Sequence, residues 1–358
     1  METPVKRQLT HDDIHAAVYG GAVLGGGGGG FVERGLRTAE LALRTGVPEL
    51  WTVDEFAAED LTATVALVGA PAAPDPQVLP THLLRALELL RRDLPRELVA
   101  IHTNENGAET TINGWFHSAI TGLPVIDLAC NGRAHPSSVM GAMGLHDADG
   151  YRAYQGYAGG KPYAYVEGSV AGGLEATSNV VRRASVEAGG WVGVARNPVE
   201  VGYAVENGAP GAVSFAIELG RRFLADGPAG AARHLGGEIA VTGTVREYRC
   251  EQREGLDVGV AVLDDDARTT LYIVNEYMAL DVAGARRASF PDLITTFDED
   301  GQPLASADVE VGEQVRVLVA PAGNLLLSRT MYMPEVYAPV EELLGIRFAP
   351  AAKVLADA

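Results

Sequence analysis

The chain has 358 residues, of which 47% are hydrophobic and 21% are charged, and its formal net charge at pH 7 is −19. This composition predicts a globular protein with enough core for two domains. So acidic a chain repels phosphate backbones and anionic lipid headgroups, so we expect no nucleic acid and no membrane partner. Apolar runs are too short for a membrane helix, and the first residues lack the apolar core of a signal peptide, which predicts a cytoplasmic protein.

The first predicted element is a short helix over residues 10–20, begun by a capping box of Thr10 and Asp13. A second helix is predicted over residues 31–44. Glycines permit positive φ angles and close approach of a ligand to the backbone, and the start of a helix favours an anion. We therefore interpret the run between these helices as a ligand-binding loop, with a tight buried crossing of two segments as the alternative. The run consists of Gly25, Gly26, Gly27, Gly28, Gly29 and Gly30.

Strands and helices alternate in the next hundred residues, as is typical of a layered α/β domain. Apolar patterning predicts helices over residues 81–94 and 111–122. It also predicts strands, over residues 49–56, 62–72, 97–103 and 123–130. Residues 151–160 are rich in glycine and tyrosine, which indicates a mobile connection or a loop over a site.

Two further helices are predicted over residues 179–195 and 211–227, and after residue 235 the apolar period changes to two. Strands are expected there over residues 238–255, 256–266, 269–280 and 311–320. The predicted fold is therefore an α/β N-terminal layered domain followed by a C-terminal β-rich domain with flanking helices. We place the first domain at residues 1–165, and the helical connection with the β-rich domain at residues 166–358.

The densest group of chemically active side chains lies in residues 102–136. Polar residues at the C-terminal ends of strands line the ligand crevice of an α/β sheet, and two predicted strands end in this way, near Glu105 and Asp127. The irregular loop that follows supplies Arg133 and His135. We predict a functional site at this edge of the sheet.

Motifs for other chemistries are weak or absent. The glycines formally match a dinucleotide fingerprint, but a helix rather than a strand is expected before them, so we expect no nucleotide cofactor and rank a dinucleotide-dependent enzyme third. A serine-hydrolase elbow is missing. Cys130 and Cys250 have no disulfide or zinc spacing and are expected to be reduced thiols. A divalent metal ion held by His117, Asp127 and His135 is left open.

Several segments together resemble the S-methyl thiohydantoin desulfurase family, whose members often lie beside hydantoinase and oxoprolinase genes. They are the glycine run, LPVIDLACNGRAHP at 123–136, GAVSFAIELGRRF at 211–223, IVNEYMAL at 273–280, FPDLITTFDEDGQPL at 290–304 and VGEQVRVLVAPA at 311–322. The resemblance spans about residues 10–345. It implies an α/β domain, a β-rich domain and hydrolytic removal of a thiol from a five-membered ring.

The resemblance also implies site positions. They are the six glycines, Glu105, Asp127, Gly132, Arg133, Asn275, Glu276 and Asp292. The chain departs from the expected pattern at Ala129, where an acid is expected, and at His135, where an aromatic residue is expected.

On this basis we expect a hydrolase that acts on a small five-membered cyclic substrate, either S-methyl thiohydantoin or a hydantoin-like ring, and that either releases a thiol or opens an amide-like bond. Asp127 or Glu105 would be the base and His135 the proton shuttle, with Cys130 as an alternative nucleophile. Arg133, the glycines, Asn275 and Glu276 would bind the substrate. The competing hypothesis is a non-catalytic partner of a hydantoinase-like enzyme that binds a small ligand. Self-association is left open.

Overall fold

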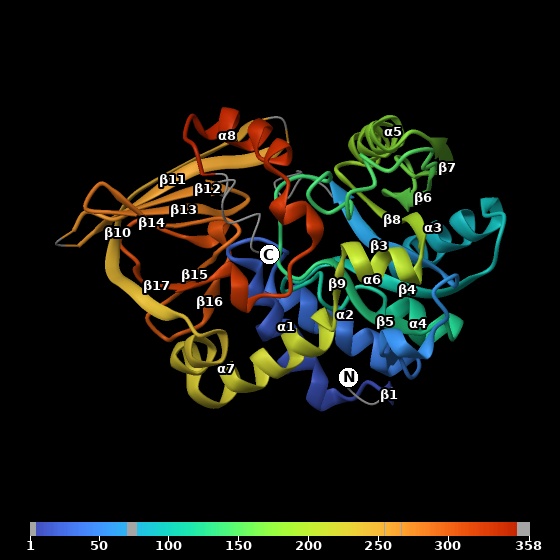
Figure 1. Cartoon of the computed structure of the whole chain (residues 1–358), viewed down its shortest axis with the longest axis horizontal. Coiled ribbons are helices and arrows are strands. Elements are labelled where there is room, and N and C mark those ends of the chain that lie inside the picture. Colours follow the sequence, from blue (N-terminus) through green and yellow to red (C-terminus); the bar gives the residue numbers. More distant parts are fainter. Residues whose placement is uncertain (1–4, 70–76, 254, 266, 349–358) are drawn as a thin grey trace.

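The computed structural model describes residues 5–69, 77–253, 255–265 and 267–348. Figure 1 shows two lobes side by side, an α/β domain and a β-rich domain, with the long helices α1 (His11–Gly25) and α7 (Ala212–Leu235) where the lobes meet. The fold class predicted from the sequence is confirmed. Within the described ranges, no helix is both long and apolar enough to span a membrane.

The first sheet is mixed, with strand order β1-β2-β5-β4-β3-β8-β6-β7 and β9 paired to β5. Its centre, from β2 to β3, is parallel, so the strand ends after β3, β4 and β5 share one edge. The strands are β1 (Lys6–Gln8), β2 (Glu49–Trp51), β3 (Leu61–Gly69), β4 (Leu98–Glu105), β5 (Val125–Asn131), β6 (Ala153–Gly159), β7 (Val166–Gly172), β8 (Trp191–Glu200) and β9 (Ala209–Pro210).

Helices cover this sheet on both faces, which explains why its central strands read as continuous apolar runs. The remaining helices of this part are α2 (Val32–Thr45), α3 (Pro80–Asp93), α4 (Trp115–Thr121), α5 (Leu174–Glu187) and α6 (Val201–Asn207). The main core joins α1, α2, α3 and α4 to the sheet, with Trp115 fully buried at its centre.

The second sheet is antiparallel throughout, with strand order β14-β13-β12-β11-β10-β17-β15-β16. Its strands are β10 (Glu238–Arg253), β11 (Leu256–Asp264), β12 (Thr270–Val274), β13 (Glu276–Val282), β14 (Ala285–Ser289), β15 (Leu293–Phe297), β16 (Pro303–Leu304) and β17 (Gln314–Ala320). Helix α8 (Ala338–Leu344) follows. The ends of α1 and α7 pack on β15 and β17, so these two helices join the domains.

Several local predictions were wrong. The single strand predicted over residues 269–280 is two antiparallel strands, β12 and β13, because the chain turns back at Asn275, whose φ angle is positive. Helix α1 continues through Gly20 instead of ending there. Glycine is needed at this position because α7 packs closely against it: a Cβ at Gly20 would lie 1.8 Å from the Ala216 carbonyl oxygen. Residues 151–160 are not a mobile connection, since they contain β6. The helix predicted over residues 179–195 ends at Glu187, and Trp191 begins β8.

The first sheet extends beyond the boundary that we placed at residue 165. Strands β7 and β8 follow that residue in the chain, and β8 pairs with both β3 and β6. The second sheet begins only at β10.

Candidate functional site

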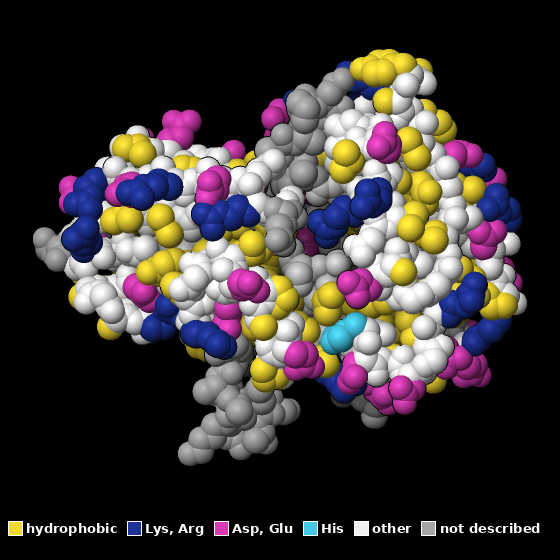
Figure 2. Space-filling model, turned by 90° about the horizontal axis from the view of Figure 1, so that it is seen from above, with side chains coloured by type: hydrophobic (Ala, Val, Ile, Leu, Met, Phe, Trp, Pro, Cys, Tyr) yellow, Lys and Arg dark blue, Asp and Glu magenta, His cyan; other side chains and the backbone are white. Residues whose placement is uncertain are grey.

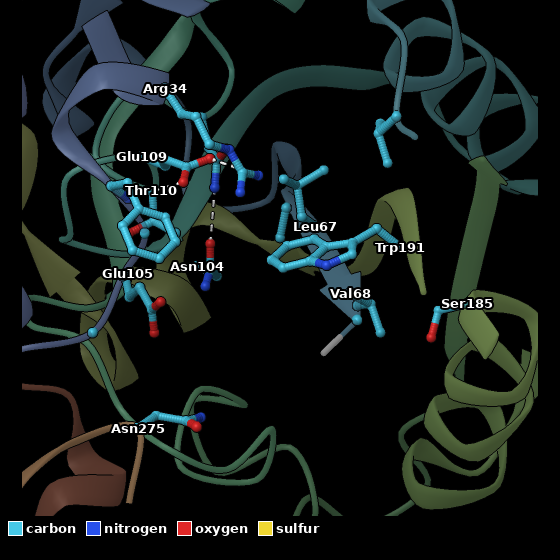
Figure 3. A pocket seen from close by; sticks show the side chains of 18 of the residues that line it. Arg34, Leu67, Val68, Asn104, Glu105, Glu109, Thr110, Ser185, Trp191 and Asn275 are labelled. Atoms are coloured by element: carbon cyan, nitrogen blue, oxygen red, sulfur yellow. Dashed lines mark hydrogen bonds and ion pairs between the residues drawn. The ribbon is translucent and has the colours of Figure 1, made fainter. Parts of the chain in front are cut away.

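A cavity of about 1320 Å³ lies between the two domains. Its walls include the glycine loop, the ends of β3 and β4, the start of β8, part of α5 and the start of β13. On the face shown in Figure 2 the surface dips between the lobes, and acidic and basic side chains are interspersed around it. Figure 3 shows Glu105 and Asn275, from different domains, at the same open space.

The glycine loop is a crossing between the domains. The carbonyl oxygen of Gly26 accepts a hydrogen bond from the Tyr277 backbone N–H at 2.9 Å, and that of Gly27 accepts one from Ser306 at 2.8 Å. Both donors belong to the second domain. The crossing that we gave as the alternative is therefore present, and because residues 27–30 also line the cavity, ligand binding by the loop stays a prediction.

One glycine of the loop is required by close approach to another backbone, and a second lies directly against an acidic side chain. A Cβ at Gly29, where φ is +72°, would lie 2.5 Å from the Cα atom of Gly107, so neither backbone has room for a side chain. A Cβ at Gly28 would lie 2.1 Å from Oε1 of Glu276. The missing side chains thus let the loop lie directly against the β4–α4 connection and against an acid of the second domain.

Glu105 and His135 form a buried pair at the end of β4. His135 Nε2 lies 3.2 Å from Glu105 Oε2, and the His135 backbone N–H donates to the same oxygen at 3.3 Å. Burial raises the pKa of Glu105 to about 8 and lowers the pKa of His135 to about 4. At neutral pH the contact therefore joins a neutral imidazole to a largely protonated carboxyl, rather than two charges.

Glu276 faces the same cavity from the second domain. Burial, and after it the negative charge of Glu105, raise its pKa well above the ordinary value, while Arg133 opposes the shift. Its Oε2 atom is buried without a hydrogen-bond partner among the described residues. The cavity therefore contains two acids with raised pKa values, one from each domain. The negative charge of one disfavours ionisation of the other.

Arg133 lies beneath the glycine loop rather than in the wall of the cavity. Its Nη1 atom donates to the carbonyl oxygens of Pro291 and Asp292 at 3.2 and 2.5 Å, and its guanidinium lies 4.4 Å from the centre of the Phe290 ring. Nε and Nη2 are buried without a partner in the described structure. The cation thus links the domains and supplies a counter-charge to Glu276.

Asp127 is not part of the cavity lining. Its Oδ1 atom accepts hydrogen bonds from the backbone N–H groups of Val213 and Ser214 at 3.0 Å each, in the first turn of α7. This arrangement satisfies N–H groups that a helix start leaves unpaired. Ala129, where the sequence pattern led us to expect an acid, is fully buried and also outside the lining. The departure at position 129 therefore leaves the lining of the cavity unchanged.

The Cys130 thiol also lies outside the cavity lining, 3.2 Å from the hydroxyl of Thr64. Burial raises its pKa to about 11, so it is protonated at neutral pH and lacks the activation of a nucleophilic thiolate. Cys250 is exposed, and neither cysteine is in a disulfide.

The metal site that the sequence left open is not formed. His117 lines the cavity, but its Nε2 atom contacts the Leu83 carbonyl oxygen at 3.2 Å, and burial lowers its pKa to about 4. In the described ranges, no three His, Cys, Asp or Glu side chains form a group able to hold a metal ion.

Asn275 sets the course of the backbone just before Glu276. Its φ angle is +55°, which asparagine tolerates better than most residues. Its side-chain oxygen accepts a hydrogen bond from the Asp257 backbone N–H at 2.9 Å, and its own backbone N–H donates to the Asp257 carbonyl oxygen at 2.8 Å.

Two other positions implied by the resemblance lie in packing contacts. Gly132 packs against the Leu326 carbonyl, and the Asp292 carboxylate accepts a hydrogen bond from the Ala322 backbone N–H.

Sequence analysis missed several lining residues. Trp191 and Arg196 lie on β8. The predicted helix over residues 179–195 covered only the first half of this strand, and Arg196 lay just beyond it. Arg34 reaches the cavity from α2 and pairs with Glu109 at 3.2 Å. Arg196 is close enough to Glu105 to oppose the rise in its pKa. Trp191 and Arg196 would have been found if the residues of β8 had been recognised as a strand.

Two family models match the chain. The N-terminal domain model of the S-Me-THD-like family matches residues 12–155, and the C-terminal domain model matches residues 174–334. The chain belongs to the S-Me-THD-like family. The resemblance to the S-methyl thiohydantoin desulfurase family, drawn from the sequence, is thereby confirmed.

A search among curated proteins found no match to this S-Me-THD-like chain. Among solved structures, it is similar to the crystal structure of a protein from Chromobacterium violaceum, with 22% sequence identity and a TM-score of 0.70. The similarity covers 94% of this chain and 96% of that one. It shows that the two proteins share a fold along almost their whole length.

Proposed function

We propose that this protein is a hydrolase that removes methanethiol from an S-methyl thiohydantoin-like ring in the cavity between its domains. The observation that carries the proposal is the pair of buried acids, Glu105 and Glu276, contributed by different domains to one cavity. Membership of the S-Me-THD-like family supports the substrate class.

The two acids have different protonation states in this proposal. Glu105, with a pKa of about 8, ionises first and acts as general base. Glu276 remains protonated, because burial and the Glu105 charge both disfavour its ionised form, and acts as general acid.

The reaction begins when the oxygen of a water molecule bonds to the ring carbon that carries sulfur. Glu105 accepts one water proton, and Glu276 gives its proton to the adjacent ring nitrogen. The new hydroxyl then becomes a carbonyl, returns its proton to Glu276, and the carbon–sulfur bond breaks. The thiolate leaves with the proton held by Glu105, as methanethiol. The products are a hydantoin and a thiol, with no change of oxidation state.

Two neighbours adjust this pair. The His135 N–H stabilises the ionised form of Glu105, which keeps its pKa from rising further, while the neutral imidazole can relay a proton. Arg133 keeps a positive charge close to Glu276 and opposes the rise in its pKa. Water activation by Glu105 thus replaces the two alternatives that the sequence left open, Asp127 and Cys130, neither of which lines the cavity.

The test is incubation of the purified protein with S-methyl thiohydantoin in H₂¹⁸O. Thiol release is followed with a thiol reagent, and the product by mass spectrometry. We expect methanethiol and a hydantoin with one ¹⁸O atom, unchanged by prior chelation. Glu105→Gln should lose about 10²- to 10⁴-fold in kcat/KM. Glu88→Gln, on the exposed face of α3, is the matched control. Binding without turnover would support a non-catalytic ligand-binding protein instead.

A further inference from the structure

The cavity is larger than the proposed ring requires. Pockets of roughly 300–1,000 Å³ enclose ligands of drug size, whereas this one has about 1320 Å³. A five-membered ring with a methylthio group fills only the part next to the two acids. The part of this volume that the described residues leave open has room for another part of the substrate.

Part of the remaining wall is apolar. Figure 3 shows Leu67, Val68 and Trp191 around open space on the far side of Glu105, and Val181 of α5 also lines the cavity. Val68 and Val181 pack together in the core on the opposite face of the sheet from Leu67 and Trp191. We therefore call Leu67 and Trp191 the apolar subsite. Leu67 and Trp191 are only partly buried, so apolar surface is left accessible inside the cavity.

Strand pairing places the apolar subsite at a fixed distance from Glu105. The sheet order is β4-β3-β8, and Gly69, next to Val68, pairs with Trp191. Trp191 lies two strands across from Glu105 and two residues further along the sheet. With strands about 4.8 Å apart and a rise of about 3.3 Å per residue, the two backbone positions are about 12 Å apart. A substituent on a ring held at Glu105 would reach it.

The Arg34 side chain lies against the Trp191 ring. The Arg34 guanidinium lies 5.5 Å from the centre of the indole ring and 5.9 Å from that of Phe31. Glu109 in turn holds Arg34 at 3.2 Å. Such cation–π contacts present the aromatic ring as a rigid wall against which a second aromatic ring can pack.

We propose that the substrate carries an aromatic substituent on its five-membered ring, and that the apolar subsite binds it. This inference rests on the proposed function, because it places the reacting ring at Glu105. Trp191 is then a specificity-determining residue that acts on the substituent and not on the carbon–sulfur bond.

The test compares 5-benzyl and 5-methyl S-methyl thiohydantoins as substrates of the full chain. Because burial of an aromatic ring is favourable, kcat/KM for the benzyl compound should be about 10- to 100-fold higher. Trp191→Ala should abolish most of this preference while leaving the methyl compound little changed. Trp191→Phe should retain much of it, and Trp51→Ala, outside the cavity, is the matched control. Equal rates for both compounds in the wild type, or equal losses in Trp191→Ala, would overturn the proposal.

Binding of the corresponding hydantoins, measured by calorimetry, separates this inference from the proposed function. Tighter binding of 5-benzylhydantoin than of 5-methylhydantoin, lost in Trp191→Ala, would support the subsite even if neither S-methyl compound were hydrolysed. Turnover without any benzyl preference would leave the proposed function intact and refute the subsite. Absence of both turnover and binding would refute both.

Discussion

Glu105→Gln should stabilise the protein at alkaline pH while it removes activity. The folded-state pKa of Glu105 is raised from 4.5 to about 8 by burial. The folded protein therefore binds the Glu105 proton more tightly than the unfolded chain does. The contribution of Glu105 to the free energy of unfolding is fully present below pH 4.5, and it is lost as the pH rises through 8. Each unit of pKa difference corresponds to about 1.4 kcal/mol, so the whole shift corresponds to roughly 5 kcal/mol.

A neutral glutamine carries no such penalty. The unfolding free energy of Glu105→Gln should therefore improve relative to the wild type by up to roughly 4 kcal/mol between pH 5 and pH 8.5. Chemical denaturation of both proteins at the two pH values measures this difference. Glu88→Gln, with its exposed side chain, should show no comparable pH dependence. A stability difference that is the same at pH 5 and pH 8.5 would refute the assignment of a raised pKa to Glu105.

Three other substitutions test the division of roles. Glu276→Gln can no longer transfer a proton and should lose at least about 10²-fold in kcat/KM at pH 8, measured by thiol release; near-wild-type activity would remove Glu276 as the acid. Asp127→Asn should weaken the start of α7 by about 0.5–2 kcal/mol in denaturant unfolding while kcat/KM stays within about tenfold of the wild type. A larger kinetic loss at unchanged stability would return Asp127 to the reaction. Cys130→Ala should remain active, since the pKa of the buried thiol is about 11, and inactivation would revive the nucleophile hypothesis.

The sequence predicted the layers of the fold and part of the site. Glycines in a row and polar residues after buried strands pointed to the edge of the sheet where the cavity lies, and Glu105 and His135 are there. Glu276 was reached through the family resemblance, because nothing in its local sequence shows that β13 meets the glycine loop of the other domain.

Other residues could not be placed from local pattern. Asp127 lies within a strand, and the sequence does not show that its side chain faces the start of α7. Trp191 and Arg196 lie at the two ends of the short segment 191–196, whose apolar residues fit a helix pattern and a strand pattern equally well. Gly20 remains helical because close packing on α7 outweighs its low helix propensity.

The pH dependence of kcat/KM tests the central claim most directly, since it reports the ionisation of the base in the free enzyme. For wild-type protein and S-methyl thiohydantoin, we predict a rise of about tenfold per pH unit below a pKa near 8 and a level region above it. Glu105→Gln should lack this limb. A wild-type profile that is flat between pH 6 and pH 9, or a limb that persists in Glu105→Gln, would contradict water activation by Glu105.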